Sequence, residues 1–387
     1  MTAPREPKRL LTIGHSYAVA VNRRLADALA GTGEWQVTAV APARFRGDFG
    51  WHTLDTSPGE RCTVEAVPVY CSRPVHVMTY GWRLRTLLRQ RWDLVHCWEE
   101  PYVAAAAQVA CWTPPGVPLV FATFQNIDKR YPPPFGYFDR YARSRASGAI
   151  AYGQTVLNVL NARGWAARPT RVIPPGVDAT RFAPDPVARL SVRTSLGWVD
   201  DTPVVGFLGR FVPEKGLLQL TSTLDRLSRP WRALLVGSGP LEPELRQWAA
   251  RHGGQVAIQT AVAHDDVPRW LNAMDLLVAP SRTTPRWREQ FGRMLIEAFA
   301  CGVAVVASDS GEIPHVVGDA GLIVPEDDTD GWLRAIERLV GDGAWRRDLS
   351  QRGRHRAVAC FDWPVVARAH LDFFDEILAR RDAERAR

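Results

Sequence analysis

Two glutamates, Glu289 and Glu297, flank a short segment that could bind an anionic ligand. The apolar pattern after Gly292 predicts a helix that begins at this glycine and runs to Ala300. Glu289 would precede this helix and Glu297 would lie inside it, about 12 Å away along the axis and about 80° away in projection. The N–H groups of Gly292 and Arg293, together with the positive end of the helix dipole, would bind a diphosphate between the two carboxylates.

A helix cap and a solvated helical residue would also explain two such glutamates, so their place in the fold decides between the interpretations. The apolar segment 276–279 predicts a strand, and the loop after it leads to Glu289. Open α/β sheets bind ligands at the carboxyl ends of their parallel strands. The position of the glutamates therefore favours a binding site.

Two cationic residues, Arg210 and Lys215, follow another predicted strand at 204–208. They lie on a loop that contains Gly209 and Gly216, and they could clamp a diphosphate and stabilise charge that develops as a bond to it breaks. A solvated surface pair is the alternative interpretation. The chain has only three lysines among many arginines, which favours a specific chemical need at Lys215.

A third element is the predicted strand 233–236, which runs into the turn Gly237-Ser238-Gly239. Glu242 stands where a dinucleotide fingerprint has its third glycine, and this disfavours NAD as a ligand. A nucleotide contact and a tight turn without a ligand explain the two glycines equally well.

The string Asp328-Thr329-Asp330 resembles the D-x-D of some metal-dependent transferases. It follows a predicted strand and precedes a predicted helix, so Thr329 or Asp330 is better explained as an N-cap. We therefore predict neither a metal site nor a cofactor.

The elements that must position these residues have the pattern of doubly wound parallel sheets. Short apolar strands alternate with amphipathic segments over 387 residues, a length that favours an α/β protein of two domains. A turn-rich segment separates two series of such elements. We expect one Rossmann-like domain at 1–180, a second at 181–364, and a final helical segment at 365–387 that packs back on the first domain. The expected strands lie at 10–13, 35–40, 93–97, 119–124, 148–152 and 171–173, then at 204–208, 233–236, 256–258, 276–279, 303–307 and 322–324.

The formal charge of +7 is compatible with nucleic acid, an anionic membrane or a phosphorylated substrate as partner. The arginines that carry it are scattered rather than clustered, so we expect no nucleic-acid partner. No apolar run reaches the ~20 residues of a membrane span, and no N-terminal segment has the apolar core of a signal peptide. We expect a soluble, cytoplasmic protein whose charge is compatible with peripheral membrane contact.

Several motifs, taken in chain order, resemble glycosyltransferase family 4. They are Pro174-Pro175-Gly176-Val177-Asp178, Gly209-Arg210 with Lys215-Gly216, Gly237-Ser238-Gly239, Pro280-Ser281, Glu289-x-Phe291-Gly292 with Glu297-Ala298, and Ser308-Asp309-Ser310-Gly311. The resemblance implies the GT-B fold, in which two Rossmann-like domains face each other across a cleft. It also implies a donor site in the C-terminal domain, an acceptor site in the N-terminal domain, and transfer with retention of anomeric configuration.

By the same resemblance, Arg210 and Lys215 would bind the donor phosphates. Glu289 would bind the transferred sugar, Glu297 the ribose, and Gly292 a phosphate or sugar through its backbone. The implied catalytic residues are Arg210, Lys215 and Glu289. The further donor-binding residues are Gly209, Gly237, Gly239, Phe291, Gly292, Arg293 and Glu297.

The N-terminal half departs from the family pattern. It has Gly14-His15 where relatives carry a glycine pair, and Gln125-Asn126 where many carry a histidine. The acceptor-side candidates are His15, His96, Glu100, Gln125, Asn126 and Lys129. His96 at a strand end is more often structural than functional. No general base is evident, so the leaving phosphate oxygen is expected to take the acceptor proton.

The sequence thus favours transfer of a sugar from a UDP- or GDP-type nucleotide-sugar to the hydroxyl of a saccharide, lipid-linked or small-molecule acceptor. An epimerase or another GT-B enzyme would keep the same cleft and change the reaction. A non-catalytic sugar-nucleotide-binding protein would keep the fold and lose the phosphate clamp. Arg210 and Lys215 are both present, which favours the enzyme.

Overall fold

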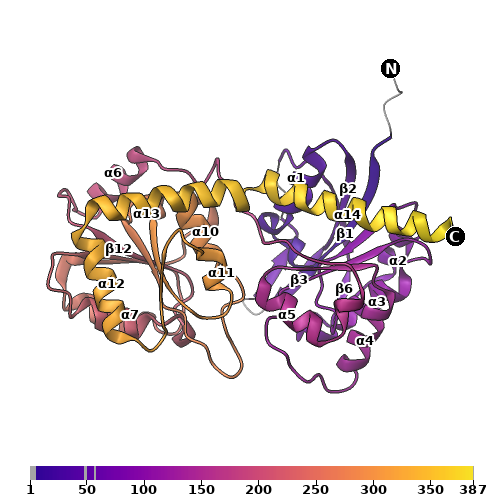
Figure 1. The fold of residues 1–387 in the computed structure, drawn as a ribbon, viewed down its shortest axis with the longest axis horizontal. Helices are drawn as coiled ribbons and strands as arrows, with labels where there is room; N and C mark the ends of the chain where they lie inside the picture. The colour runs from indigo at the N-terminus through magenta and orange to yellow at the C-terminus, as the bar shows by residue number, and fades with distance from the viewer. Residues whose placement is uncertain (1–5, 48–49, 56–57, 387) are drawn as a thin grey trace. The chain divides into compact units, whose positions relative to one another are not determined.

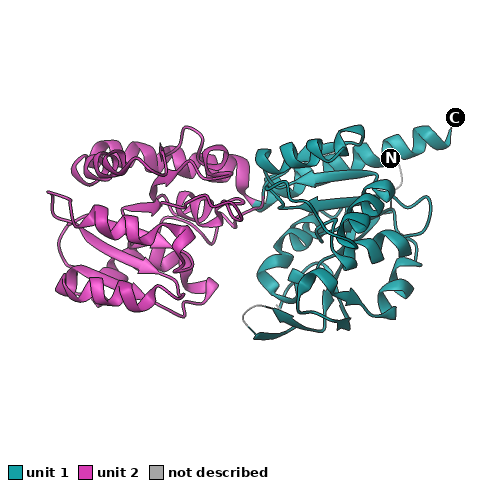
Figure 2. Cartoon of the chain, turned by 90° about the horizontal axis from the view of Figure 1, so that it is seen from below, with its two compact units in different colours: residues 1–174, 363–387 teal, residues 175–362 magenta. Residues whose placement is uncertain are grey.

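The computed structural model describes residues 6–47, 50–55 and 58–386, which form two compact units. Unit 1 comprises Met1–Pro174 and Trp363–Arg387, and unit 2 comprises Pro175–Asp362 (Figure 2). The sequence placed the division between residues 180 and 181, and the two units divide between 174 and 175. The chain returns to unit 1 at its final helix, so this unit is built from both ends of the chain.

Unit 2 contains a parallel sheet of six strands in the order β14-β13-β12-β15-β16-β17. The strands are β12 (Val204–Leu208), β13 (Arg232–Val236), β14 (Val256–Gln259), β15 (Leu276–Ala279), β16 (Ala304–Ser308) and β17 (Leu322–Val324). The sequence predicted all six, because the four inner strands are buried on both faces and read as apolar runs, and the two edge strands are also mostly apolar. The strand order reverses between β12 and β15, and such a switch point is where doubly wound sheets bind ligands.

Helices cover both faces of this sheet, and alternate residues of each strand point to the two layers. One layer contains α7 (Leu217–Leu224), α8 (Glu242–Ala250) and α12 (Thr329–Gly341). The other contains α6 (Pro186–Ser195), α9 (Val267–Asn272), α10 (Arg293–Ala300), α11 (Ile313–Val317) and part of α13 (Gly343–Arg356). Val205 and Phe207 of β12 pack on the first layer, whereas Val204 packs on the second.

Unit 1 contains a parallel sheet of seven strands in the order β11-β10-β9-β8-β1-β2-β5. They are β1 (Lys8–Ile13), β2 (Trp35–Pro42), β5 (Thr63–Val67), β8 (Leu94–Cys97), β9 (Leu119–Thr123), β10 (Gly148–Ala151) and β11 (Thr170–Val172). The order reverses between β1 and β8, so unit 1 also has a switch point.

Two helical layers again enclose the sheet. The layer of α2 (Trp82–Leu88), α3 (Ala104–Trp112), α4 (Phe135–Arg145) and α5 (Gln154–Ala162) covers one face. The other face is covered by α1 (Arg24–Gly31) and α14 (Trp363–Arg385) (Figure 1). Val366, Phe374 and Ile377 of α14 belong to the core on this face. The final helix therefore completes the core of unit 1.

Five strands of unit 1 were not predicted from the sequence. Two hairpins, β3 (Arg44–Gly47) with β4 (Gly50–Thr53) and β6 (Val69–Tyr70) with β7 (Thr79–Tyr80), are short and alternate in exposure. The fifth, β5, lies at the sheet edge and exposes two of its residues. In the parts of the chain that the structure describes, no helix has the length and hydropathy that crossing a bilayer requires.

Candidate functional site

At the switch point of unit 2, the loops after β12 and β15 bring a lysine and a glutamate together. Lys215 ends the 3₁₀ helix Pro213–Lys215, and its Nζ donates a hydrogen bond to Oε2 of Glu289. The two side chains are 11% and 10% exposed, although their positions in the chain are 74 residues apart. A buried ion pair costs desolvation free energy and adds little net stability. Its place at the ligand-binding edge therefore points to a binding role.

Two further side chains complete the surroundings of this ion pair. Ser281 donates its hydroxyl to Oε2 of Glu289 at 3.1 Å. Trp287 lies with its ring centroid 5.2 Å from Nζ of Lys215, a cation–π contact. No role was predicted for Trp287 from the sequence, because its contact with the lysine arises only in the folded chain.

Two glycines allow the loops around the ion pair to approach each other closely. Gly216 has φ +69°, and a Cβ on it would lie 1.9 Å from the carbonyl oxygen of Pro280. Gly311, in the loop after β16, has φ +59° and would place a Cβ 2.0 Å from the carbonyl oxygen of Glu289. The same carbonyl accepts the N–H of Glu312 at 3.1 Å. The backbone of the glutamate is thus held from the neighbouring loop.

Helix α10 begins beside Glu289, as the sequence predicted. Gly292 is its N-cap with φ +82°, a left-handed conformation that glycine adopts readily. Among the residues that the structure describes, none accepts a hydrogen bond from the backbone N–H of Gly292, Arg293 or Met294, as is usual in a first turn. Arg293 is exposed, whereas the Phe291 ring is buried in the core. Phe291 can therefore contact a ligand only through its main chain.

Glu297 lies one turn inside α10 and is 8% exposed. Burial raises the pKa of its carboxyl to about 7, although the charges of Arg293 and Arg181 lower it. Within the described chain, this carboxyl has no hydrogen-bond or ion-pair partner. A buried, unpartnered carboxyl group is suited to bind the hydroxyl groups of a ligand.

We expect the affinity for a nucleoside diphosphate to depend on pH through Glu297. Ionised carboxylate accepts hydroxyl hydrogen bonds more strongly than its acid form, so binding should strengthen about tenfold as pH rises from 6 to 8 through the raised pKa. Calorimetry across this range with UDP and GDP measures the effect, and Glu297→Gln should flatten the profile. The exposed Glu244→Gln on α8 serves as control. A profile that keeps its slope in Glu297→Gln would show that another group titrates.

The other donor-side candidates lie on two loops that are hydrogen-bonded to each other. Gly209 donates its N–H to Val236 at 3.0 Å, and a Cβ on Gly237 would lie 1.8 Å from the carbonyl oxygen of Gly209. Gly239 has φ +154° and packs against the backbone of Phe211. Positive φ angles and close backbone contacts therefore explain why glycine occupies these positions. Arg210, in the loop after β12, is exposed, and its guanidinium has no ion pair with any described residue.

The Asp328-Thr329-Asp330 string caps α12, and the capping residue is Asp328 rather than Thr329 or Asp330. Its carboxylate accepts the N–H of Gly331 at 2.8 Å. Asp330 instead pairs with Arg226 on the surface. Asp328 is the N-cap because the helix begins one residue later, at Thr329.

At the switch point of unit 1, a buried carboxylate binds the loop after β1. Glu99 follows β8 and is 2% exposed. Its Oε1 accepts the N–H of His15 and the Tyr80 hydroxyl, both at 2.6 Å, and its Oε2 accepts Nδ1 of His15 at 2.6 Å. His15 was an acceptor-side candidate, and Glu99, like its neighbour Glu100, was expected just after a strand at this edge, whereas Tyr80 was not among the predicted site residues. Nothing in the sequence connects these positions, since the histidine and glutamate are 84 residues apart.

The remaining acceptor-side candidates differ in their environments. His96 is fully buried, and its Nδ1 forms a hydrogen bond with the Thr12 hydroxyl. Its ring packs against that of His370 in α14. Burial lowers its pKa to about 3, so it is a neutral core residue that cannot contact a ligand at the sheet edge. Glu100 accepts hydrogen bonds from Thr123 and from the N–H of Phe124, which attaches it to the end of β9.

Gln125 and Asn126 follow β9 and are buried, at 9% and 2% exposure. Nε2 of Gln125 donates to the carbonyl of Ile127 at 2.6 Å, so this side chain shapes its own loop. Lys129 is exposed, and its carbonyl accepts a hydrogen bond from Arg163. Of the six candidates, His15 and Glu100 thus lie at the switch point with Glu99.

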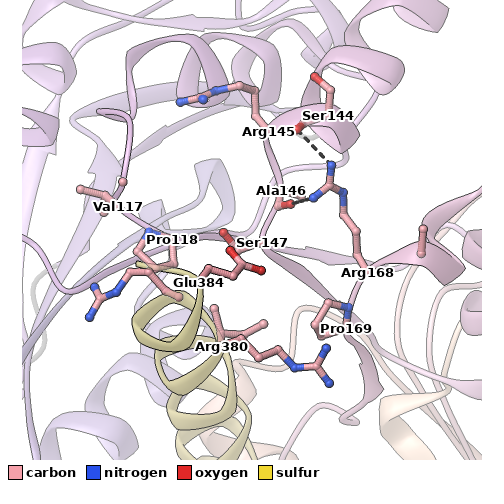
Figure 3. Close-up of a pocket in the computed structure, with 14 residues that line it drawn as sticks. Val117, Pro118, Ser144, Arg145, Ala146, Ser147, Arg168, Pro169, Arg380 and Glu384 are labelled. Atoms are coloured by element: carbon pink, nitrogen blue, oxygen red, sulfur yellow. Dashed lines mark hydrogen bonds between the residues drawn. The ribbon is translucent and has the colours of Figure 1, made fainter. Parts of the chain in front are cut away.

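A pocket of about 400 Å³ lies at the opposite edge of the unit 1 sheet. Val117 and Pro118 precede β9, and Ser147 precedes β10, so its lining residues mark the amino ends of the strands (Figure 3). Two of the arginines that line it donate to main-chain carbonyls: Arg168 to those of residues 144 and 146, and Arg145 to those of residues 110 and 113. The pocket contains none of the predicted site residues.

Two doubly wound sheets, each with polar side chains at its switch point, and a final helix that returns to the first unit define the GT-B fold. Solved structures have the same fold. Sucrose-phosphate synthase from Thermosynechococcus elongatus has a TM-score of 0.74 at 21% identity and covers 96% of this chain and 100% of that one. HepE of Anabaena, solved in complex with UDP, has a TM-score of 0.72 at 21% identity over 95% and 100% of the two chains.

Family models match both units. Residues 18–181 match Glycosyltransferase Family 4, and residues 202–342 match Glycosyl transferases group 1. The chain therefore belongs with the family 4 glycosyltransferases. It is similar to a GDP-mannose-dependent alpha-(1-6)-phosphatidylinositol monomannoside mannosyltransferase of Mycolicibacterium smegmatis, at 34% identity over 59% of this chain and 58% of that protein. It is also similar to a D-inositol 3-phosphate glycosyltransferase of Saccharomonospora viridis, at 35% identity over 54% and 50%. The chain thus spans little more than half the length of these relatives.

Proposed function

We propose that the protein transfers a sugar from a nucleoside-diphosphate-sugar to an acceptor hydroxyl. The observation that carries this proposal is the buried Lys215–Glu289 pair beside the N-terminus of α10. A cation, a carboxylate and free N–H groups within one ligand-binding edge are complementary to a sugar linked to a diphosphate. The family membership of both units supports the same reaction.

Each part of the donor has a complementary group in unit 2. Arg210 and Lys215 would bind the diphosphate together with the N–H groups at the beginning of α10. Glu289 would accept hydrogen bonds from the sugar hydroxyls, and Glu297 from those of the ribose. As the bond between the anomeric carbon and the phosphate oxygen breaks, its electron pair stays on the diphosphate, where the two cations stabilise the charge.

We propose retention of anomeric configuration and no metal requirement, since the cations of the chain supply positive charge at the diphosphate. A UDP- or GDP-type donor accords with the GDP-mannose-dependent relative and with the UDP complex of HepE. An inositol-containing or glycolipid acceptor accords with the acceptors in the relatives' names.

We also propose a cytoplasmic enzyme with peripheral membrane contact through unit 1. Its surface exposes Trp51, Trp82 and Tyr137, and Arg44 lies 4.2 Å from the ring centroid of Trp51. Exposed aromatic residues beside arginines suit the interface of an anionic bilayer. This contact would bring a lipid-linked acceptor to the enzyme.

A screen of nucleotides by thermal unfolding tests the proposed function. UDP or GDP at 100 times its dissociation constant should stabilise the fold by about 2.7 kcal/mol, and EDTA should leave this shift unchanged. Release of nucleotide from the matching nucleotide-sugar should then require an acceptor such as an inositol phosphate. Absence of stabilisation by every nucleotide would overturn the proposal, and acceptor-independent turnover would favour an epimerase or hydrolase.

A further inference from the structure

The pocket of about 400 Å³ at the amino ends of the unit 1 strands is a feature that the proposed function does not use. Its volume is within the range of small-molecule binding sites. One wall is formed by the segments that precede β9, β10 and β11, and the other wall by the last turns of α14 (Figure 3). Both walls belong to unit 1, so the pocket is complete within one compact unit.

The two walls of the pocket are attached to each other by close packing and by a hydrogen bond. A Cβ on Gly148, the first residue of β10, would lie 2.7 Å from Cδ1 of Ile377, so glycine allows α14 to approach the sheet closely at this point. Near the end of α14, Nη2 of Arg385 donates to the carbonyl of Gly116 at 2.8 Å. A ligand would therefore meet walls that are already in place, which lowers the entropy cost of binding it.

The charges that line the pocket are predominantly positive. They belong to four arginines and one glutamate: Arg145, Arg168, Arg380, Arg381 and Glu384. Arg380 pairs with Glu376 at 2.9 Å, and Arg381 pairs with its neighbour Asp382 at 2.8 Å. Among the residues that the structure describes, no carboxylate pairs with Arg145 or Arg168, although both arginines are half-buried. The pocket therefore has a positive charge that an anionic ligand would neutralise.

Arg168 has the geometry that recognition of a phosphate requires. Its Nη1 and Nη2 donate to the carbonyls of Ala146 and Ser144, as the dashed lines in Figure 3 show. These bonds fix the plane of the guanidinium and use two of its five N–H groups. The remaining N–H groups are thereby oriented for phosphate oxygens. Arg380 is exposed and pairs only within its own helix, so it can turn toward the same anion at little cost.

Glu384 and Ser147 add groups that bind hydroxyls rather than phosphate. Although Arg380 lies four residues earlier, it pairs with Glu376, and Glu384 has no ion pair or hydrogen bond with any described residue. Its carboxylate repels a bare phosphate ion but accepts hydrogen bonds from neutral hydroxyl groups. Oγ of Ser147 accepts the N–H of Leu119 at 3.3 Å, which leaves its own O–H able to donate. The lining thus favours an anion that also carries hydroxyl groups.

We propose that this pocket binds a phosphorylated sugar or polyol, a molecule that carries a phosphate monoester beside free hydroxyl groups. Arg168 and Arg380 would bind the phosphate, and Glu384 would accept hydrogen bonds from the hydroxyls. Because the ligand would contact both walls, it would stabilise the last turns of α14 on unit 1. The pocket lies at the opposite end of the strands from the switch point of unit 1, and unit 2 contributes no residue to it. It is therefore a site additional to those of the proposed function.

Hydrogen–deuterium exchange with glucose 6-phosphate as the probe tests where the ligand binds. Saturating probe should slow exchange about tenfold or more in residues 377–385 and 144–147, because binding stabilises both walls. The protection should be the same with and without UDP or GDP, so a failure of nucleotide binding would affect the proposed function alone. Protection confined to unit 2 or to the carboxyl ends of the unit 1 strands would overturn the proposal.

The source of the phosphate monoester is tested by comparing three probes in solution. Glucose 6-phosphate should bind about tenfold more tightly than inorganic phosphate, because only the former offers hydroxyls to Glu384. Vesicles that contain phosphatidylinositol 4-phosphate present the same chemistry on a lipid headgroup. Protection of the pocket by these vesicles but not by glucose 6-phosphate would overturn a free small molecule as the ligand.

Substitutions in the exposed part of the pocket test the assigned roles without disturbing the core. Arg380→Gln should weaken the affinity for glucose 6-phosphate about tenfold in calorimetry, because it removes a charge-assisted hydrogen bond. Glu384→Gln should weaken the binding of glucose 6-phosphate and strengthen that of inorganic phosphate. Arg246→Gln removes the arginine of a similar i,i+4 pair on α8 and should change neither affinity. Unchanged binding in Arg380→Gln, or the same response of both probes to Glu384→Gln, would overturn the proposal.

Discussion

Replacing Lys215 with alanine is expected to lower kcat by about 100- to 1,000-fold, the range found when one charge-stabilising donor is removed from an active site. The same loss is expected for Glu289→Ala. The Lys215→Ala substitution removes the cation that would bind the diphosphate. It also leaves the buried Glu289 carboxylate without the lysine that pairs with it. Initial rates at saturating donor and acceptor measure this effect.

A loss of folding could produce the same result, and a double variant separates the two causes. Lys215→Ala alone should destabilise the fold, because removing one partner of a buried pair costs about 3–5 kcal/mol. Lys215→Met with Glu289→Gln removes both charges, so the free energy of unfolding in urea should largely recover. Activity should not recover with it. Near-wild-type turnover in the double variant would contradict the site assignment.

An exposed ion pair on the same unit gives the control for charge removal. Arg246 and Glu242 pair across one turn of α8 at 2.8 Å. Arg246→Ala should leave both turnover and stability unchanged, because exposed pairs of this kind contribute little. A loss of turnover and stability in Lys215→Ala but not in Arg246→Ala would show that the position of Lys215, rather than charge removal itself, causes the effect.

The sequence was sufficient for the donor-side unit because its signals are local. Each of its six strands is a short apolar run, and Gly292 followed by the apolar pattern of α10 marks a helix N-terminus. Lys215 and Glu289 could each be assigned to a loop after a strand. Their direct contact required the strand order, which brings β12 beside β15.

Unit 1 was harder to predict for physical reasons that individual residues illustrate. The pairing of Glu99 with His15 depends on β8 lying beside β1, and no local pattern contains that information. His96, by contrast, could have been assigned to the core. It alternates with Val95 and Cys97 along β8, so it must face the opposite helical layer, where α14 lies.

Gly311→Ala is expected to disrupt the site through the backbone rather than through a ligand contact. The added Cβ would lie 2.0 Å from the carbonyl oxygen of Glu289 and 3.0 Å from its nitrogen. These are main-chain atoms that cannot rotate away, so the glutamate backbone or the loop after β16 must move. A displacement of about 1 Å at a reacting centre can lower the rate about 100-fold. Steady-state kinetics should show this loss.

The strain of a left-handed alanine must be separated from this displacement. Gly197 has φ +72°, similar to the +59° of Gly311, but no heavy atom lies within 4 Å of a Cβ built on it. Gly197→Ala should therefore cost only the ~1–2 kcal/mol of left-handed strain, with kcat unchanged. If Gly311→Ala lost no more activity than Gly197→Ala, the loop after β16 would not determine the position of Glu289. If it lost activity while binding nucleotide normally, the backbone of Glu289 would be identified as the element that aligns the sugar with its acceptor.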